Sequence, residues 1–148
     1  MISQEEKEVL NSVCKFVKME LGYILDKTRI CPEPKMISWQ DLYFKNPFIE
    51  ENLYQDLLNK NQNIENLNEI SENTELKFLD EKSFEKKLHQ EKTKTFFVIS
   101  VPGFSKEGDK SLVLVKALSE SENPNYSTIF FLQKTTHFWD LKQCYRID

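Results

Sequence analysis

The chain has 148 residues and a mass of 17.6 kDa, a size that fits one domain spanning residues 1–148. With 39% hydrophobic and 30% charged residues, the composition predicts a buried core under a polar surface and excludes a disordered or fibrous chain. The net charge of −4 argues against a nucleic-acid binder, because neutralising phosphates needs a surplus of Lys and Arg.

The sequence also lacks the features of secreted and membrane proteins. Residues 1–8 contain no basic start followed by an apolar run, and apolar runs such as residues 96–99 are far shorter than the roughly 20 residues that span a bilayer. The cysteines Cys14, Cys31 and Cys144 are too scattered for a disulfide framework. We therefore expect a cytoplasmic protein without membrane contact.

The chain begins with a strong helix signal. Ser3 and Glu6 have the spacing of a capping box, and apolar residues then recur at helical spacing over residues 9–21. This pattern predicts an amphipathic helix. Gly22 is expected to end the helix with a positive φ, before a short strand at residues 23–25.

The middle of the chain has weaker signals. Two prolines predict a loop at residues 31–34, and Asn46 followed by Pro47 predicts a helix that runs to about residue 59. An Asn-rich loop is expected over residues 59–73. A strand over residues 75–80 and a short helix over residues 83–90 complete a mainly helical part, residues 1–92.

The last part, residues 93–148, is rich in β-branched and aromatic residues. The strands expected there are residues 95–101, 111–118, 128–133 and 138–147. Pro102-Gly103 is predicted to form the centre of a type II turn, and Gly108 is predicted to supply a positive φ in the next connection. We therefore predict an α+β fold in which N-terminal helices pack on one face of a C-terminal four-stranded antiparallel β-meander.

The residue types that carry catalysis are sparse. Cys14 or Cys144 could be combined with His137 and Asp140 as a Cys-His-Asp set, although each of these residues has a simpler structural or surface role. Three glycines are too few for a phosphate-binding loop, and no close Cys or His pair indicates zinc. We expect no catalytic residues, no metal and no cofactor.

Negative charge is concentrated in the middle of the chain. Residues 50–91 contain eleven carboxylates and five lysines, a local balance of −6. Such a run is often only a solvated helix face, but it also suits the docking of a basic protein. The residues expected to bind that partner are Glu50, Glu51, Asp56, Glu65 and Glu69, with the nearby aromatics Trp39 and Tyr43.

One segment resembles a known group of proteins. Ser100-Val101-Pro102-Gly103-Phe104, followed by a Lys- and Gly-containing turn and the apolar strand at residues 111–118, is similar to a hairpin element of uncharacterised bacterial proteins, many of them from the Bacteroidetes. A later strand entering a Lys134–Trp139 hairpin fits the same pattern. The resemblance implies the C-terminal antiparallel meander and no activity.

Three classes of function remain open from the sequence. The first is a non-enzymatic protein-binding module, most specifically an antitoxin-like immunity protein that neutralises a basic partner toxin. The second is a small-molecule-binding domain with an apolar pocket between the sheet and the first helix. The third is a hydrolase that uses Cys144 or Cys14 with His137.

Overall fold

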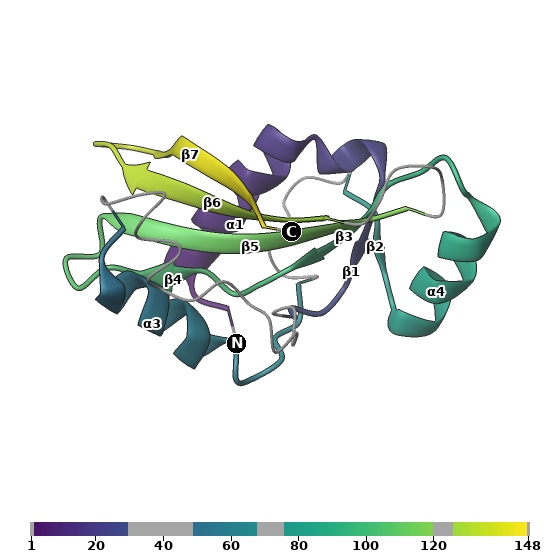
Figure 1. The fold of residues 1–148 in the computed structure, drawn as a ribbon, viewed down its shortest axis with the longest axis horizontal. Coiled ribbons are helices and arrows are strands. Elements are labelled where there is room, and N and C mark those ends of the chain that lie inside the picture. Colours follow the sequence, from purple (N-terminus) through teal and green to yellow (C-terminus); the bar gives the residue numbers. More distant parts are fainter. Residues whose placement is uncertain (1, 30–48, 68–75, 120–125, 148) are drawn as a thin grey trace.

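The computed structural model describes residues 2–29, 49–67, 76–119 and 126–147 (Figure 1). The predicted loop at residues 31–34 and the Asn46-Pro47 helix cap lie outside these ranges. The helical elements are α1 (Gln4–Val17), the 3-10 turn η1 (Met19–Leu21), α3 (Glu51–Lys60) and α4 (Glu81–Gln90). The strands are β1 (Tyr23–Leu25), β2 (Phe78–Leu79), β3 (Phe96–Ile99), β4 (Gly103–Phe104), β5 (Lys110–Leu118), β6 (Tyr126–Lys134) and β7 (Trp139–Ile147).

The strands form one seven-stranded mixed sheet. Its order is β2-β1-β3-β5-β6-β7, and β4 pairs with β5. The α+β class is confirmed, and β3, β5, β6 and β7 pair antiparallel as expected. The four-stranded meander was nevertheless an incomplete prediction, because β1 pairs in parallel with both β2 and β3 and joins the helical part of the chain to the same sheet. Strands of two or three residues carry too little pattern to reveal such distant pairing.

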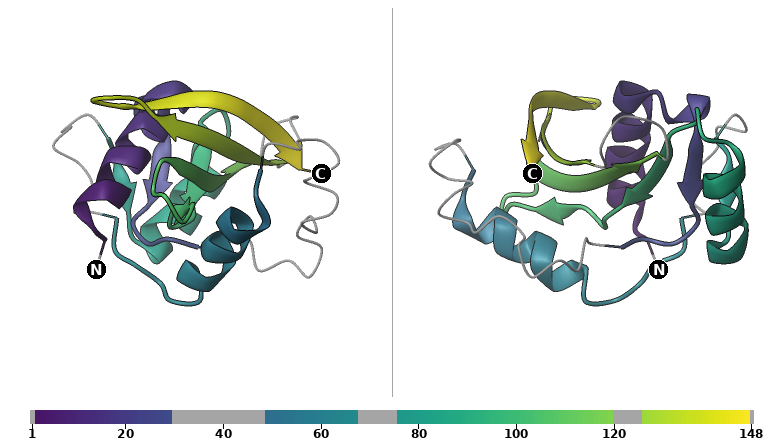
Figure 2. Two further views of the ribbon diagram at one scale, coloured as in Figure 1. Left: turned by 90° about the vertical axis from the view of Figure 1, so that its left-hand side faces the viewer. Right: turned by 45° about the vertical axis from the view of Figure 1, so that its right-hand side comes forward.

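Helices cover both faces of this sheet, not one face as predicted (Figure 2). Residues of α1 pack with Val113 and Val115 of β5, whereas α3 packs against Leu112 and Leu114, whose side chains point the opposite way. On the same face as α3, Phe84 of α4 packs on β1 and β3. A strand covered on both sides is apolar along its length, which explains why β5 does not alternate.

The capping box of α1 is confirmed. The Ser3 amide donates to Glu6 Oε1 at 2.8 Å, and the Glu6 amide donates to Ser3 Oγ at 3.2 Å. The helix ends earlier than predicted, because Lys18 takes the left-handed conformation with φ of 55°. Gly22 is extended instead, and its small size is needed because a Cβ there would lie 2.2 Å from the Thr95 carbonyl oxygen.

The helix α4 begins at Glu81 behind an Asp80 cap. Of the predicted strand 75–80, residue 75 lies outside the described ranges, and only residues 78 and 79 of the described part enter the sheet. A hydrogen bond from the Tyr23 hydroxyl to Glu91, at 2.8 Å, joins the end of α4 to β1. This bond raises the pKa of Tyr23 and lowers that of Glu91, because it favours the protonated phenol and the ionised carboxylate.

A β-bulge separates β3 from β4. Ile99 pairs with Val115 and Gly103 with Leu112, so three residues on one strand face two on the other. The extra residue is accommodated by side chains: Ser100 Oγ accepts from the Leu114 amide at 2.9 Å, and the Asn61 carboxamide bonds both the amide and the carbonyl of Val101. Asn61 follows α3, so the end of this helix holds the bulge.

Gly103 is therefore not the centre of a type II turn. Such a turn requires a positive φ at the glycine, and among the described glycines only Gly108 has one, at 74°. The requirement at Gly103 is space, since a Cβ there would lie 2.5 Å from the Leu57 backbone nitrogen of α3. The glycine lets the helix and the strand pack backbone to backbone.

We predict that Gly103→Ala lowers the free energy of unfolding by about 1 to 3 kcal/mol, because neither α3 nor β4 can yield without breaking its hydrogen bonds. Urea denaturation would measure the loss. Gly108 is the matched control, since a Cβ there meets nothing within 4 Å and only φ matters. Gly108→Asn should be nearly neutral, because Asn tolerates the left-handed conformation. Equal stabilities for Gly103→Ala and the wild type would contradict the packing argument.

Candidate functional site

The seven residues predicted to bind a partner do not form one described cluster. Glu50, Glu51 and Asp56 belong to α3 and its N-cap, while Glu65 lies on a later segment whose backbone bonds Thr28. Trp39, Tyr43 and Glu69 lie outside the described residues. The helix itself begins at Glu51 and not at Pro47, with Ile49 and Tyr54 packed in one apolar cluster around its first turn.

Asp56 makes structural contacts that the sequence did not predict, although its side chain stays 32% exposed. Its Oδ2 accepts from the Phe104 amide at 2.7 Å and also lies 3.2 Å from Lys60 Nζ. Lys60 in turn lies over the Phe104 ring, 4.6 Å from the centroid. Asp56 and Asn61 thus hold the bulge and β4 against α3, one turn and a half apart on the helix.

Glu50 is also already paired. Its carboxylate accepts from Lys110 Nζ at 3.0 Å, a contact that ties the N-terminus of α3 to the first residue of β5. The hydrogen bond raises the pKa of Lys110, because it stabilises the ammonium form. Glu50 therefore offers a partner less negative charge than its position suggests.

Glu51 is still available for the predicted binding of a basic partner. It is exposed, and within the described part of the chain it makes no ion pair. Gln55 and Asn59 are exposed as well, and their spacing of four residues places all three on one row along the helix. The outer side of α3 is thus a polar row with one carboxylate and two carboxamides.

Among the described residues, two further carboxylates of the region 50–91 are paired away from this row, while Glu69, Glu72 and Glu75 lie outside the described ranges. Glu81 forms an ion pair with Arg29, and Glu91 lies 3.4 Å from Lys87. Both belong to the α4 end of the sheet, away from α3 in Figure 1. The described carboxylates of this region are therefore divided between the two ends of the sheet, and Arg29 and Lys110 offset two of the six excess negative charges.

The geometry of the Cys-His-Asp set does not favour a nucleophile. Cys14 is buried under α1, and burial raises its pKa to about 12. Cys144 is exposed on β7, five residues beyond Trp139, so the strand rise places it about 16 Å from the turn that holds His137. His137 lies against Phe138 in that turn.

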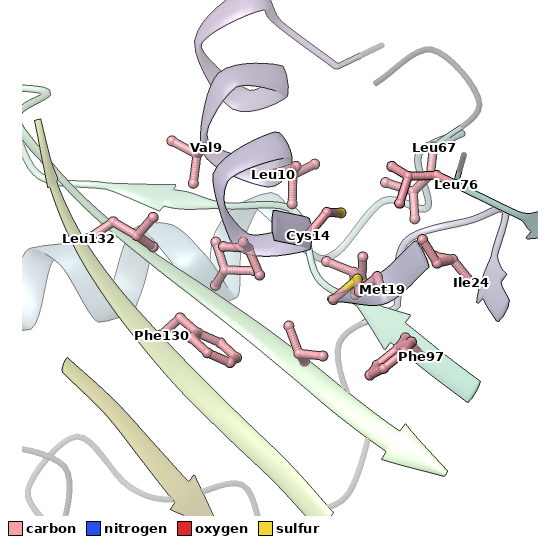
Figure 3. Packing of buried hydrophobic residues seen from close by; sticks show 14 of the residues in the cluster. Val9, Leu10, Cys14, Met19, Ile24, Leu67, Leu76, Phe97, Phe130 and Leu132 are labelled. Carbon is pink, nitrogen blue, oxygen red and sulfur yellow. The ribbon is translucent and has the colours of Figure 1, made fainter. Parts of the chain in front are cut away.

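The space that the sequence assigned to an apolar pocket is filled. Between α1 and the sheet, Val9, Leu10 and Val13 are fully buried among strand residues (Figure 3). In the described ranges, no three Cys, His, Asp or Glu residues are placed to hold a metal ion. The same ranges contain no helix with the length and apolar character needed to cross a membrane.

The structure reveals a groove that the sequence analysis missed. It lies beside α3, has a volume of about 430 Å³ and is open to solvent; its lining residues are Lys110, Phe131, Gln133, Lys142 and Gln143. Phe131 belongs to the apolar cluster beneath α3 and forms the floor. The lining residues come from the three neighbouring strands β5, β6 and β7.

A second β-bulge builds this groove. Phe131 pairs with Gln143 and Leu132 with Leu141, so Lys142 is an extra residue in β7. Before the bulge, Trp139 and Leu141 pack on the α1 face; after it, Tyr145 packs on the α3 face. The change of side brings Lys142 and Gln143 together in the groove. A sequence analysis that assumes strict alternation of side chains along β7 does not predict this bulge.

Comparison of the chain with models of protein families, with curated proteins and with solved structures found no match. The resemblance of the Ser100–Phe104 element to Bacteroidetes-type proteins therefore stays a prediction. Its structural role is clear within this molecule, since the element contains the bulge and the glycine on which α3 packs.

We predict that Asp56→Ala lowers the free energy of unfolding by about 1 to 2 kcal/mol, because the Phe104 amide loses a charged acceptor. Glu51→Ala is the control and should change stability by less than about 0.5 kcal/mol, as expected for an exposed residue that makes no ion pair with the described residues. Thermal or urea unfolding of both variants would compare them. Equal losses would show that Asp56 is not part of the α3 attachment.

We predict that the two described cysteines differ sharply in reactivity. In a Cys31→Ser background at pH 8, iodoacetamide should alkylate exposed Cys144 and leave Cys14 unmodified, because a thiol of pKa about 12 is ionised in only about one molecule in ten thousand. Mass spectrometry of peptides would locate the label. Cys14 should react once the protein is unfolded, and its rapid reaction in the native state would instead restore it as a candidate nucleophile.

Proposed function

We propose that the protein is a non-enzymatic protein-binding module, most specifically an antitoxin-like immunity protein that neutralises a basic partner toxin. The observation that carries the proposal is the outer row of α3, where Glu51, Gln55 and Asn59 are exposed on a helix whose inner side is held by Gly103, Asp56 and Asn61.

A rigid helix suits this role. A surface that is ordered before binding loses less conformational entropy in the complex, so more of the contact energy is left for affinity. The two carboxamides can each donate and accept hydrogen bonds, and the carboxylate of Glu51 can accept from Lys or Arg of a basic partner.

The row is the centre of such an interface and not the whole of it. A stable complex buries about 800 Å² on each partner, roughly a tenth of the 8689 Å² surface of this chain. One helix row supplies only part of that area, so neighbouring residues must contribute. Because Glu50 and Asp56 are engaged internally, electrostatic attraction depends on Glu51 more than on the number of nearby carboxylates.

The test starts from the native cell. The tagged chain should capture a basic protein, and association of the purified pair should slow about two- to tenfold with Glu51→Lys, because reversing a charge in the interface acts mainly on the association rate. Glu85→Lys on α4 is the matched control, since it reverses an exposed carboxylate at the other end of the sheet. Surface plasmon resonance at low and physiological salt would measure both.

The immunity function needs its own readout. Production of the captured partner alone should stop growth of a host cell, and co-production of this chain should restore it. An acidic partner, or equal effects of Glu51→Lys and Glu85→Lys, would overturn the α3 interface. A captured protein that is harmless when produced alone would overturn the immunity assignment.

A further inference from the structure

We infer that the groove beside α3 is a binding site for a ligand that carries a single carboxylate next to an apolar group. The inference stands independently of the proposed interface on α3. It follows from the five side chains that line the groove and from the bulge that brings two of them together.

The size of the groove suits a small ligand. Its volume of about 430 Å³ falls within the range of about 300 to 1,000 Å³ that is usual for small-molecule sites. The floor is the Phe131 side chain, which is only 5% exposed and is held in the cluster beneath α3. An apolar part of the ligand can rest on this floor while polar groups face the walls.

The walls present hydrogen-bond donors. Lys142 makes no ion pair within the described part of the chain, and its ammonium group has three donor hydrogens. The Tyr145 hydroxyl donates to Gln143 Oε1, and the NH₂ group of the same carboxamide has two hydrogens that can be donated to a ligand. The Lys110 ammonium group donates one hydrogen bond to Glu50, and its other hydrogens can be donated to a second acceptor.

Among anions, the charges around the groove favour a monoanion over a dianion. Lys110 and Lys142 contribute two positive charges, and Glu50 offsets one of them. Asp140 adds a carboxylate beside Gln133 on the same face, although it does not line the groove. Asp109 and Glu107 act on Lys110 as well. The four carboxylates outnumber the two lysines, so binding of an anion depends on direct contact with the Lys142 ammonium and not on the net charge of the region. A carboxylate of charge −1 meets less repulsion there than a phosphate dianion.

The position of the bulge supports this assignment. Bulges in edge strands re-aim side chains and are frequent beside functional sites. Without the extra residue in β7, period-two alternation would separate Lys142 and Gln143 onto opposite faces of the sheet. The bulge thus brings the Lys142 ammonium group and the Gln143 carboxamide together beside the Phe131 ring.

The test uses benzoate as the probe, with benzamide and inorganic phosphate for comparison. Titration of the ¹⁵N-labelled chain at low salt should give saturable shifts of the amides of Phe131, Gln133 and Gln143 with benzoate. Lys142→Gln should weaken binding about tenfold or more, as expected when a charged hydrogen bond is lost. Lys86→Gln on α4 is the matched control and should leave the titration unchanged.

Each alternative outcome is distinct. Absence of saturable shifts with benzoate would overturn the site, and equal binding of benzamide would overturn the need for a charge. Phosphate binding as tight as benzoate would overturn the assignment to a monoanion. An unchanged unfolding temperature for Lys142→Gln would show that weaker binding reflects the groove and not the fold. None of these results bears on capture of a protein by α3.

Discussion

The attachment of α3 to the sheet at Gly103 is the contact on which the rest of this face depends. The backbones of α3 and β4 approach so closely that there is no room for a Cβ at Gly103, and this contact fixes the distance and the orientation of the helix relative to the strand. The same contact region supplies hydrogen-bond partners to the backbone of the β3–β4 bulge and of β4. Asn61 bonds the amide and the carbonyl of Val101, and Asp56 accepts from the Phe104 amide. Packing and polar satisfaction are therefore accomplished by the same few residues.

This attachment decides what the helix can offer to other molecules. Carboxylates on the inner side of α3 serve the fold, and Glu50 is drawn to Lys110 at the helix start. Among the described residues of α3, the outer row of Glu51, Gln55 and Asn59 is the exposed part that can meet a partner. Four described carboxylates of residues 50–91 are paired within the molecule, and Arg29 and Lys110 offset two of the six excess negative charges. A partner therefore meets a weaker field than the number of carboxylates along the sequence suggests.

The position of α3 also explains the groove. The helix covers Leu112, Leu114 and Ile129, but the corner around Phe131 and β7 stays open, with Lys110 and Glu50 at its border. The α1 face differs, because the longer helix fills its side of the sheet with apolar side chains. A site for a ligand is consequently found on the α3 face, where cover is incomplete and polar groups converge.

By itself, the sequence determined the capping box of α1, the course of the long strands β5 to β7, the α+β class and the exposure of Glu51, because caps and periodicity depend on neighbouring residues. Only the tertiary structure decided the parallel pairing of β1, the cover of both faces, the internal roles of Glu50 and Asp56, and the groove. These features arise from contacts between distant segments. The two bulges show the reason most directly, since one extra residue moves every later side chain to the other face of a strand without leaving a signal in the local pattern.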